Sequence, residues 1–302
     1  MYICDYFLEV LLMKQLVSSL SGNPLIKKIK VKDYLLSGET FDLYYDRACD
    51  MLVTKPVPAN LPDYYKSATY QPHRLQRKSF FDRIYRWVRN RSFRYKYRLI
   101  TNNHPKVRSV LDYGTATGDF LAFLQTKGID VCGVEPDNDA RRIANSLLSA
   151  NVFERIEDCN RKFDVITLWH VFEHVDKPGE LLEKLIKKLH PGGLIVIAVP
   201  NYKSYDAVYY KQYWAAYDVP RHLWHFSPLS IHKIFEKHRL QLLAQKPLIF
   251  DSFYVSLLSE QYMTGKKKWI SAFITGLKSN FKARKTGNYS SLIYIAKQTD
   301  KN

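Results

Sequence analysis

The residues best suited to ligand chemistry lie within positions 111–137. An apolar run ends there in Asp112, glycines follow at Gly114 and Gly118, and a second apolar run ends in Glu135. Glycines let the backbone turn sharply and approach a ligand closely. A carboxylate at the end of the second run can accept hydrogen bonds from both hydroxyls of a ribose. The spacing therefore predicts a nucleoside-binding turn.

The elements that must position this turn alternate between strand and helix patterns. Strands are expected at 107–113, 129–135, 163–169 and 194–200, and helices at 117–127, 137–150 and 179–190, the last closed by Pro191-Gly192-Gly193. Such alternation indicates an α/β fold, a doubly wound parallel sheet with helices on both faces. Ligands of these sheets lie beyond the carboxyl ends of the strands. We also expect a helix at 227–238 capped by Ser227, a strand near 240–250 and a last strand at 289–297.

Asp112 decides between two classes of nucleotide cofactor. A nicotinamide dinucleotide requires G-x-G-x-x-G, so that its pyrophosphate rests on a helix N-terminus. Here the glycine spacing is G-T-A-T-G, and Asp112 would repel a pyrophosphate. The same carboxylate would attract a cationic ligand. S-adenosylmethionine carries a sulfonium, an ammonium and a ribose without any phosphate, so the residue chemistry favours it.

Longer segments resemble the Rossmann-like (class I) S-adenosylmethionine-dependent methyltransferases. The resemblance covers about residues 105–300 and is carried by LDYGTATGDF, VEPD, FDVITLWHVFEHV and LHPGGLIVIAVPN. WAAYDVPRHLWHFSP further resembles a bacterial methyltransferase-domain family related to the ubiquinone-biosynthesis type. The resemblance implies a mostly parallel seven-stranded sheet and S-adenosylmethionine as cofactor. We expect the acceptor to be a small molecule, such as a sugar, a lipid or a quinone-like precursor, methylated at oxygen.

The resemblance also assigns cofactor-binding residues by matched position. These are Asp112, Gly114, Thr115, Gly118, Glu135, Trp169 and His170. Ala116 departs from the pattern, because many members have glycine there. An adenine-contacting acid is expected after the third strand, and Glu157 and Asp158 are both near that place. The strand pattern before them is too weak to choose between the two.

Three side chains are candidate proton acceptors, because an oxygen acceptor must lose a proton as it takes the methyl group. They are His170, His222 and Asp218. Histidine suits this role at neutral pH. His222 and Asp218 lie in the aromatic-rich segment 201–226, which follows the strand at 194–200 and should border the pocket.

The run from His170 to His174 also matches H-x-x-E-H, a pattern of zinc proteases. A strand leads directly into His170, and Pro178 limits any helix after it, which disfavours that chemistry. A divalent cation on Glu173 and His174 is an alternative. We expect no metal, with His174 fixing its loop through hydrogen bonds to the backbone.

The chain divides by composition into three parts. We expect a small N-terminal subdomain at 1–72, a basic linking helix at 73–104 and the methyltransferase domain at 105–302. The first part resembles lead-in segments whose paired cysteines bind zinc, but only Cys49 remains at that place, so no metal is expected. The chain shows no C-x-x-C pair, no signal-peptide pattern and no apolar run of about eighteen residues, which favours a cytoplasmic setting.

Charge leaves two further partners open. The 302 residues carry 46 Lys and Arg against 29 Asp and Glu, a formal net charge of +17. Residues 74–98 hold ten basic side chains and one acid, which we expect to form a solvated helix face; an RNA or DNA methyltransferase is the alternative. A second alternative function, independent of charge, is a module that binds S-adenosylmethionine without catalysing a reaction. Residues 265–284 form an amphipathic helix pattern, whose apolar face we expect on the core; peripheral membrane contact is the alternative.

Overall fold

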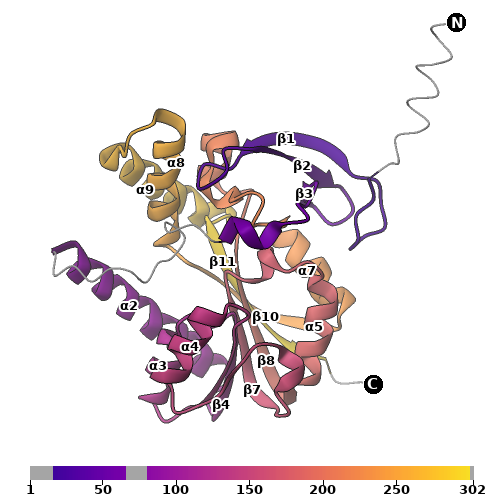
Figure 1. Cartoon of the computed structure of the whole chain (residues 1–302), viewed down its shortest axis with the longest axis vertical. Helices are drawn as coiled ribbons and strands as arrows, with labels where there is room; N and C mark the ends of the chain where they lie inside the picture. The colour runs from indigo at the N-terminus through magenta and orange to yellow at the C-terminus, as the bar shows by residue number, and fades with distance from the viewer. Residues whose placement is uncertain (1–15, 66–79, 300–302) are drawn as a thin grey trace, which may run out of the picture.

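The larger of two sheets has seven strands in the order β10-β11-β8-β7-β4-β5-β6. The computed structural model describes residues 16–65 and 80–299 (Figure 1). The strands are β4 (Ser109–Tyr113), β5 (Asp130–Val134), β6 (Val152–Phe153), β7 (Phe163–Trp169), β8 (Leu189–Pro200), β10 (Leu240–Pro247) and β11 (Ser291–Gln298). Only β11 runs antiparallel to its neighbours, so the mostly parallel seven-stranded sheet expected from the sequence is confirmed.

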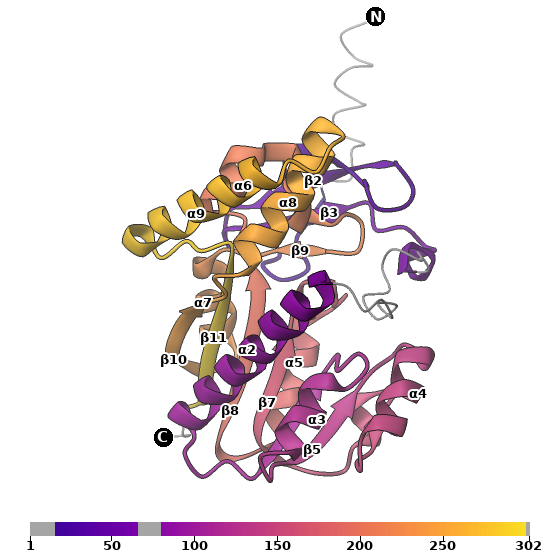
Figure 2. The same cartoon turned by 90° about the vertical axis from the view of Figure 1, so that its left-hand side faces the viewer.

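Helices cover both faces of this sheet, because neighbouring residues of its buried strands point to opposite faces. Ile166 and Ile195 share a core with α5 (Pro178–Lys187) and α7 (Pro228–Lys237). Val165 and Val196 belong to a second core with α2 (Phe80–Asn103), α3 (Asp119–Gln125) and α4 (Asn138–Leu147). Figure 2 shows α2 crossing the sheet on this second side. Because helices cover both faces, the sheet has the doubly wound arrangement expected from the sequence.

The element boundaries agree with the sequence pattern except at β8. Pro191, Gly192 and Gly193 were expected to separate a helix from the next strand, but β8 already begins at Leu189 and includes them. Leu189 pairs with Phe163 of β7, which extends the strand toward its amino end. Ser227 caps α7 as expected, with its side chain accepting from the Ser230 N–H.

The smaller sheet combines N-terminal strands with a strand from the middle of the chain. β1 (Ile26–Lys32), β2 (Thr40–Asp46) and β3 (Met51–Lys55) are joined by β9 (Trp224–His225), all antiparallel. This sheet lies above the larger one in Figure 1, and the short helix η1 (Leu61–Tyr65) follows β3. The N-terminal strands therefore pack directly on the segment that follows β8, whereas the three-part division of the chain stays a prediction.

The segments after β8 and β10 supply the remaining helices. α6 (Tyr205–Tyr210) and two short 3-10 helices, η4 (Lys211–Tyr213) and η5 (Ala215–Tyr217), lead into β9. α8 (Asp251–Thr264) and α9 (Trp269–Thr286) form a hairpin between β10 and β11. Among the described residues, no helix combines the length and apolar character needed to span a bilayer.

The orientation of α9 corrects one expectation. Its apolar face was expected on the core, but the residues it buries are small: Ala272, Thr275, Gly276, Ser279 and Ala283. Its large apolar side chains point to solvent instead. The spacing of apolar residues therefore predicted the helix correctly, but the prediction of which face packs against the protein was wrong.

Candidate active site

The glycine turn connects β4 to α3 at the carboxyl edge of the large sheet. The backbone N–H groups of Gly114 and Thr115 both donate to the Val134 carbonyl, at 2.7 and 3.1 Å. Gly114 and Gly118 have φ of 75° and 80°, in the left-handed region that glycine adopts without strain. The turn is therefore tied to the end of β5, where a nucleoside would cross the edge.

Ala116 adopts the same left-handed conformation without being glycine. Its φ is 50°, and its side chain is exposed. The exposed position leaves room for the methyl group, and the left-handed conformation costs about 1–2 kcal/mol of backbone strain.

Glu135 holds the other side of the turn. Its Oε2 accepts the Ala116 N–H at 2.8 Å, and its Oε1 accepts the Asp137 N–H at 2.9 Å. Partial burial raises the pKa of Glu135, and the two backbone donors oppose that shift. Each carboxylate oxygen keeps a second lone pair, so Glu135 can still accept hydroxyl groups of a ligand.

Asp112 is buried at the end of β4 and interacts with Lys96, a half-buried cation that no sequence motif marks. Burial raises the pKa of Asp112 to about 6, against a hydrogen bond from the Thr167 hydroxyl and the charge of Lys96. Burial likewise lowers the pKa of Lys96 to about 8. Lys96 Nζ lies 4.2 Å from the centre of the Trp169 ring. Trp169 Nε1 is buried without a hydrogen-bond partner among residues 16–65 and 80–299.

His170 follows β7 directly and is held between two carboxylates. Its Nδ1 lies 3.3 Å from Glu173 Oε1, and its Nε2 lies 3.0 Å from Asp251 Oδ2. Burial lowers the pKa of His170, but these two acids outweigh it and raise the pKa to about 10. Its φ of 56° is a strained conformation for a residue with a side chain. At neutral pH His170 is thus a rigid imidazolium.

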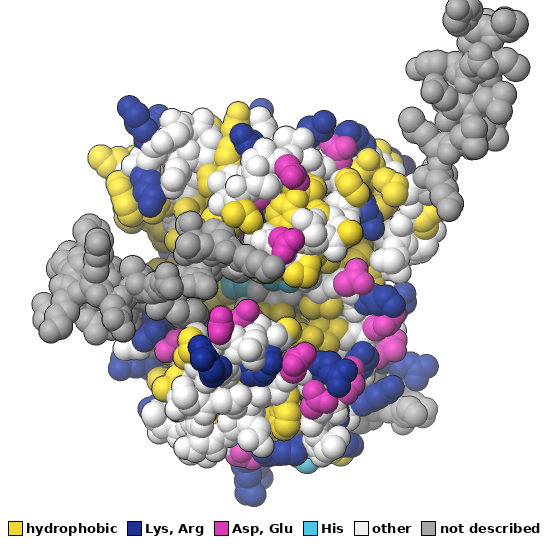
Figure 3. Space-filling view, in the orientation of Figure 1, with side chains coloured by type: hydrophobic (Ala, Val, Ile, Leu, Met, Phe, Trp, Pro, Cys, Tyr) yellow, Lys and Arg dark blue, Asp and Glu magenta, His cyan; other side chains and the backbone are white. Residues whose placement is uncertain are grey.

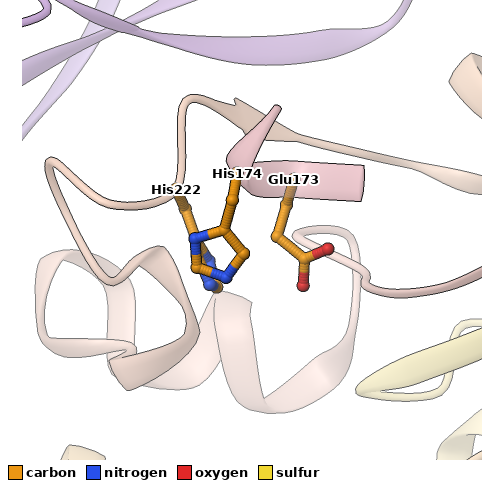
Figure 4. A group of neighbouring side chains, drawn as sticks. All are labelled: Glu173, His174 and His222. Atoms are coloured by element: carbon orange, nitrogen blue, oxygen red, sulfur yellow. The ribbon is translucent and has the colours of Figure 1, made fainter. Parts of the chain in front are cut away.

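A second group of side chains lies next to His170 and is drawn in Figure 4. Ligand atoms of Glu173, His174 and His222 all lie within 4.8 Å of one another. His174 Nδ1 is 3.1 Å from the Arg221 carbonyl and His222 Nδ1 is 2.8 Å from the Ala216 carbonyl, so donation to these carbonyls leaves each Nε2 as an acceptor. His174 thus fixes its loop as expected. Two imidazoles and a carboxylate could hold a divalent cation; the absence of metal stays a prediction.

The three candidate proton acceptors differ in what surrounds them. Asp218 Oδ1 accepts from Arg221 Nε and Nη2 at 2.9 and 2.6 Å, and Arg221 also pairs with the buried Asp33. Burial holds the pKa of His222 well below its usual range, so His222 is neutral. Of the three, His222 is neutral, Asp218 pairs with Arg221, and His170 already carries a proton.

The two candidates for the adenine-contacting acid each lie beside a basic side chain. Glu157 pairs with Lys184 at 2.7 Å, and Asp158 lies 3.4 Å from Arg155. They follow β6, which has only two residues, and this explains why the sequence marks that strand so weakly. Neither acid is singled out as the adenine contact.

The chain matches a family whose members share a methyltransferase domain. The match covers residues 82–245, which is more than half of the chain. The chain belongs to this methyltransferase-domain family. Its sheet order and its glycine turn after β4 are those of a Rossmann-like class I methyltransferase domain.

Curated relatives share a shorter region of this methyltransferase domain. An uncharacterized methyltransferase of Mycobacterium tuberculosis (strain ATCC 25618 / H37Rv) is 31% identical over 108 residues, 33% of this chain and 42% of the relative. One from Mycobacterium leprae (strain TN) is 32% identical over 108 residues, 33% of this chain and 40% of the relative. The chain thus spans less than half the length of these relatives.

Solved structures show similarity over different portions of the chain. The sugar N-methyltransferase KedS8 from Streptoalloteichus sp ATCC 53650 is 25% identical, with a TM-score of 0.34 over 39% of this chain and 53% of that one. The cyclopropane synthase MmaA2 from Mycobacterium tuberculosis is 13% identical, with a TM-score of 0.47 over 67% of this chain and 82% of that one. The assignment of the methyltransferase domain rests on the family match and the sheet order.

Proposed function

We propose that this chain transfers a methyl group from S-adenosylmethionine to an oxygen of a small molecule, in the class of sugars, lipids or quinone-like precursors. The observation that supports this most is the buried Asp112 carboxylate beside a glycine turn whose far side is held by Glu135. In its ionised form this buried carboxylate attracts a cationic ligand and repels a pyrophosphate.

The side chains around the turn fit the chemical groups of S-adenosylmethionine. Asp112 and Lys96 interact with each other and place one acidic and one basic group at the same end of the turn. Such a pair suits the ammonium and carboxylate of an amino acid. Glu135 suits the ribose hydroxyls, and the unpartnered indole N–H of Trp169 offers a donor to a polar ligand atom.

When bound, S-adenosylmethionine supplies a methyl group activated by its sulfonium, and transfer is an in-line displacement by the acceptor. The chain contributes mainly by holding cofactor and acceptor in line. His170, fixed by Glu173 and Asp251, forms a rigid wall at the end of β7. The proton of a hydroxyl acceptor would pass to Nε2 of His222, where the charge of Glu173 would offset part of the cost that burial places on the protonated ring.

Labelled S-adenosylmethionine tests this function directly. The full chain is incubated with methyl-labelled S-adenosylmethionine and a cell extract, and small molecules are separated from nucleic acid and protein. We expect the label in the small-molecule fraction. Label in nucleic acid would instead favour the alternative that uses the basic helix, and binding of the cofactor without any labelled product would favour a non-catalytic module.

The alternative of a nucleic-acid methyltransferase can be tested separately by the salt dependence of RNA or DNA binding. Binding through Lys and Arg to phosphates weakens steeply with salt, since counterions are released. Several basic side chains of α2, such as Arg91, Arg94 and Arg98, are exposed, whereas Lys96 is turned toward Asp112. We expect only weak, salt-sensitive RNA or DNA binding, measured by fluorescence anisotropy at two salt concentrations.

Cofactor affinity should depend on pH through Asp112. Its carboxylate is ionised above its pKa of about 6 and attracts an ammonium in that form. Affinity therefore rises as the pH increases through about 6, by up to about tenfold per pH unit, and falls again near pH 8 as Lys96 loses the charge that attracts the ligand carboxylate. Titration calorimetry with S-adenosylmethionine between pH 5 and 8 measures this. Asp112→Asn should bind weakly and lose the rise through pH 6, whereas Asp139→Asn, which changes an exposed acid, should keep the wild-type profile.

A further inference from the structure

Helix α9 presents its large apolar side chains to solvent. Six of its large apolar residues are exposed: Trp269, Ile270, Phe273, Ile274, Leu277 and Phe281. Ile270 is 78% and Phe281 65% exposed. Single exposed apolar residues are ordinary on a protein surface, but a contiguous row of this kind marks an interaction site. We call these six side chains the α9 outer face.

Packing within the chain does not account for this row. The inner face of α9 is made of small residues because it approaches α8 closely. A Cβ added to Gly276 would lie 2.7 Å from Phe253 Cδ1, so even a methyl group is excluded there. The helix thus has two well-defined faces, and the large apolar residues lie on the outer one, where Phe273 stacks on Phe253 of α8 but all six side chains remain exposed.

The apolar surface continues from α9 onto α6. Val208 and Tyr209 are exposed on α6. A groove of about 340 Å³ lies between the two helices, and its lining includes Tyr209, Ile270 and Ile274. The outer face and this groove together offer both a flat apolar area and a recess for a hydrocarbon chain.

The charge around this surface has one sign. Residues 265–287 contain no Asp or Glu, and their basic side chains are Lys266, Lys267, Lys268, Lys278, Lys282, Arg284 and Lys285. All seven are exposed. Figure 3 shows Lys and Arg side chains beside hydrophobic ones at the upper left, over α8 and α9. An apolar row flanked only by cations is complementary to a surface that is both apolar and anionic.

We propose that the α9 outer face binds the surface of an anionic phospholipid membrane. The helix would lie parallel to the bilayer, with Trp269 and Phe273 among the acyl chains and the lysines at the headgroups, as interfacial helices do. A second copy of this chain fits less well, since a two-fold contact would bring like charges together. The basic side chains would add attraction to anionic lipids.

This membrane contact would also bring the candidate site close to the lipid headgroups. α8 packs on α9 and begins at Asp251, which contacts His170. The choice of acceptor rests on the proposed methyl transfer. Given that function, the arrangement favours a lipid as the acceptor. Membrane binding itself does not depend on methyl transfer.

Vesicle co-sedimentation of the full chain tests the proposal. We expect binding to vesicles of phosphatidylcholine with phosphatidylglycerol, decreasing with salt, and little binding to phosphatidylcholine alone. Replacing Lys266, Lys267 and Lys268 by glutamine should weaken binding on the order of 100-fold at low salt. The control replaces Lys28, Lys30 and Lys32 of β1, which are also exposed, and removes the same charge from another surface.

A tryptophan pair separates the apolar contribution. Trp269 is 60% and Trp87 59% exposed, but Trp87 lies on α2. Trp269→Ser should weaken vesicle binding about tenfold, and Trp87→Ser should leave it unchanged. These side chains are on the surface, so thermal melting should be unaffected in each variant.

Several results would overturn the membrane proposal. The wild-type protein could bind neutral and anionic vesicles equally, or bind neither. The two lysine triple variants could lose the same amount of vesicle affinity. The wild-type protein could also be a dimer that Trp269→Ser dissociates. The last outcome would assign the surface to a second copy. Calorimetry with S-adenosylmethionine on the same variants keeps the two proposals separate, because cofactor binding should persist in all of them.

Discussion

Gly114→Ala should lower the free energy of unfolding by about 2–5 kcal/mol, and the melting temperature by roughly 5–15 °C. Two costs add at this position. Gly114 has a φ of 75°, which costs a residue with a Cβ about 1–2 kcal/mol. A Cβ there would also lie 2.4 Å from Val171 Cγ2, an overlap that forces the turn or the loop after β7 to move. Thermal melting measures the loss.

Gly128→Ala is the matched control for this substitution. Gly128 has the same φ of 75°, but a Cβ there would meet nothing within 4 Å. Gly128→Ala should therefore lower the free energy of unfolding only by the backbone cost, about 1–2 kcal/mol. Val171→Ala should rescue Gly114→Ala toward the Gly128→Ala level, because it removes the clashing methyl groups. Equal losses in Gly114→Ala and Gly128→Ala would show that the turn is not packed against Val171.

Local patterns made the fold and the glycine turn predictable. The strand and helix periods, the glycines and the Ser227 cap are each read within a few residues, and they agree with one another. The turn at Gly114 and the position of Trp169 at the end of β7 follow from such local signals. For that reason the sequence placed the glycine turn at the carboxyl edge of the sheet, where the structure has it.

Contacts between distant segments were not predictable in the same way. Lys96 lies in a run of basic residues, where nothing distinguishes the one side chain that turns inward to Asp112. Asp251 begins a helix far along the chain and reaches His170 only because β10 and β11 bring α8 to the site. Neither pairing has a spacing that a single sequence could reveal.

The orientation of α9 had a signal that periodicity alone does not use. Apolar spacing identifies an amphipathic helix but does not say which face meets the protein. The opposite face carries Ala272, Gly276, Ser279 and Ala283, three or four residues apart. Small residues at that spacing indicate a close helix contact, which would have placed the large side chains outside.

Glu135→Ala should weaken S-adenosylmethionine binding by about 10–150-fold, corresponding to roughly 1.5–3 kcal/mol for hydrogen bonds to a charged group. The substitution removes the acceptor for the ribose and also the anchor of the Ala116 and Asp137 N–H groups. Glu135→Gln keeps one acceptor oxygen and should fall between wild type and Glu135→Ala. Calorimetry gives the affinities, and thermal melting reports how much of the loss comes from a loosened turn.

A double-mutant cycle with the ligand isolates the ribose contact from that anchoring role. Wild-type protein should bind S-adenosylhomocysteine more tightly than its 2′-deoxy analogue, because Glu135 accepts from the hydroxyl that the analogue lacks. Glu135→Ala should bind the two ligands almost equally, since the partner is gone, and the difference between the two ratios is the coupling energy. If the variant still prefers the hydroxyl as strongly as wild type does, Glu135 shapes the turn only, and another side chain must bind the ribose.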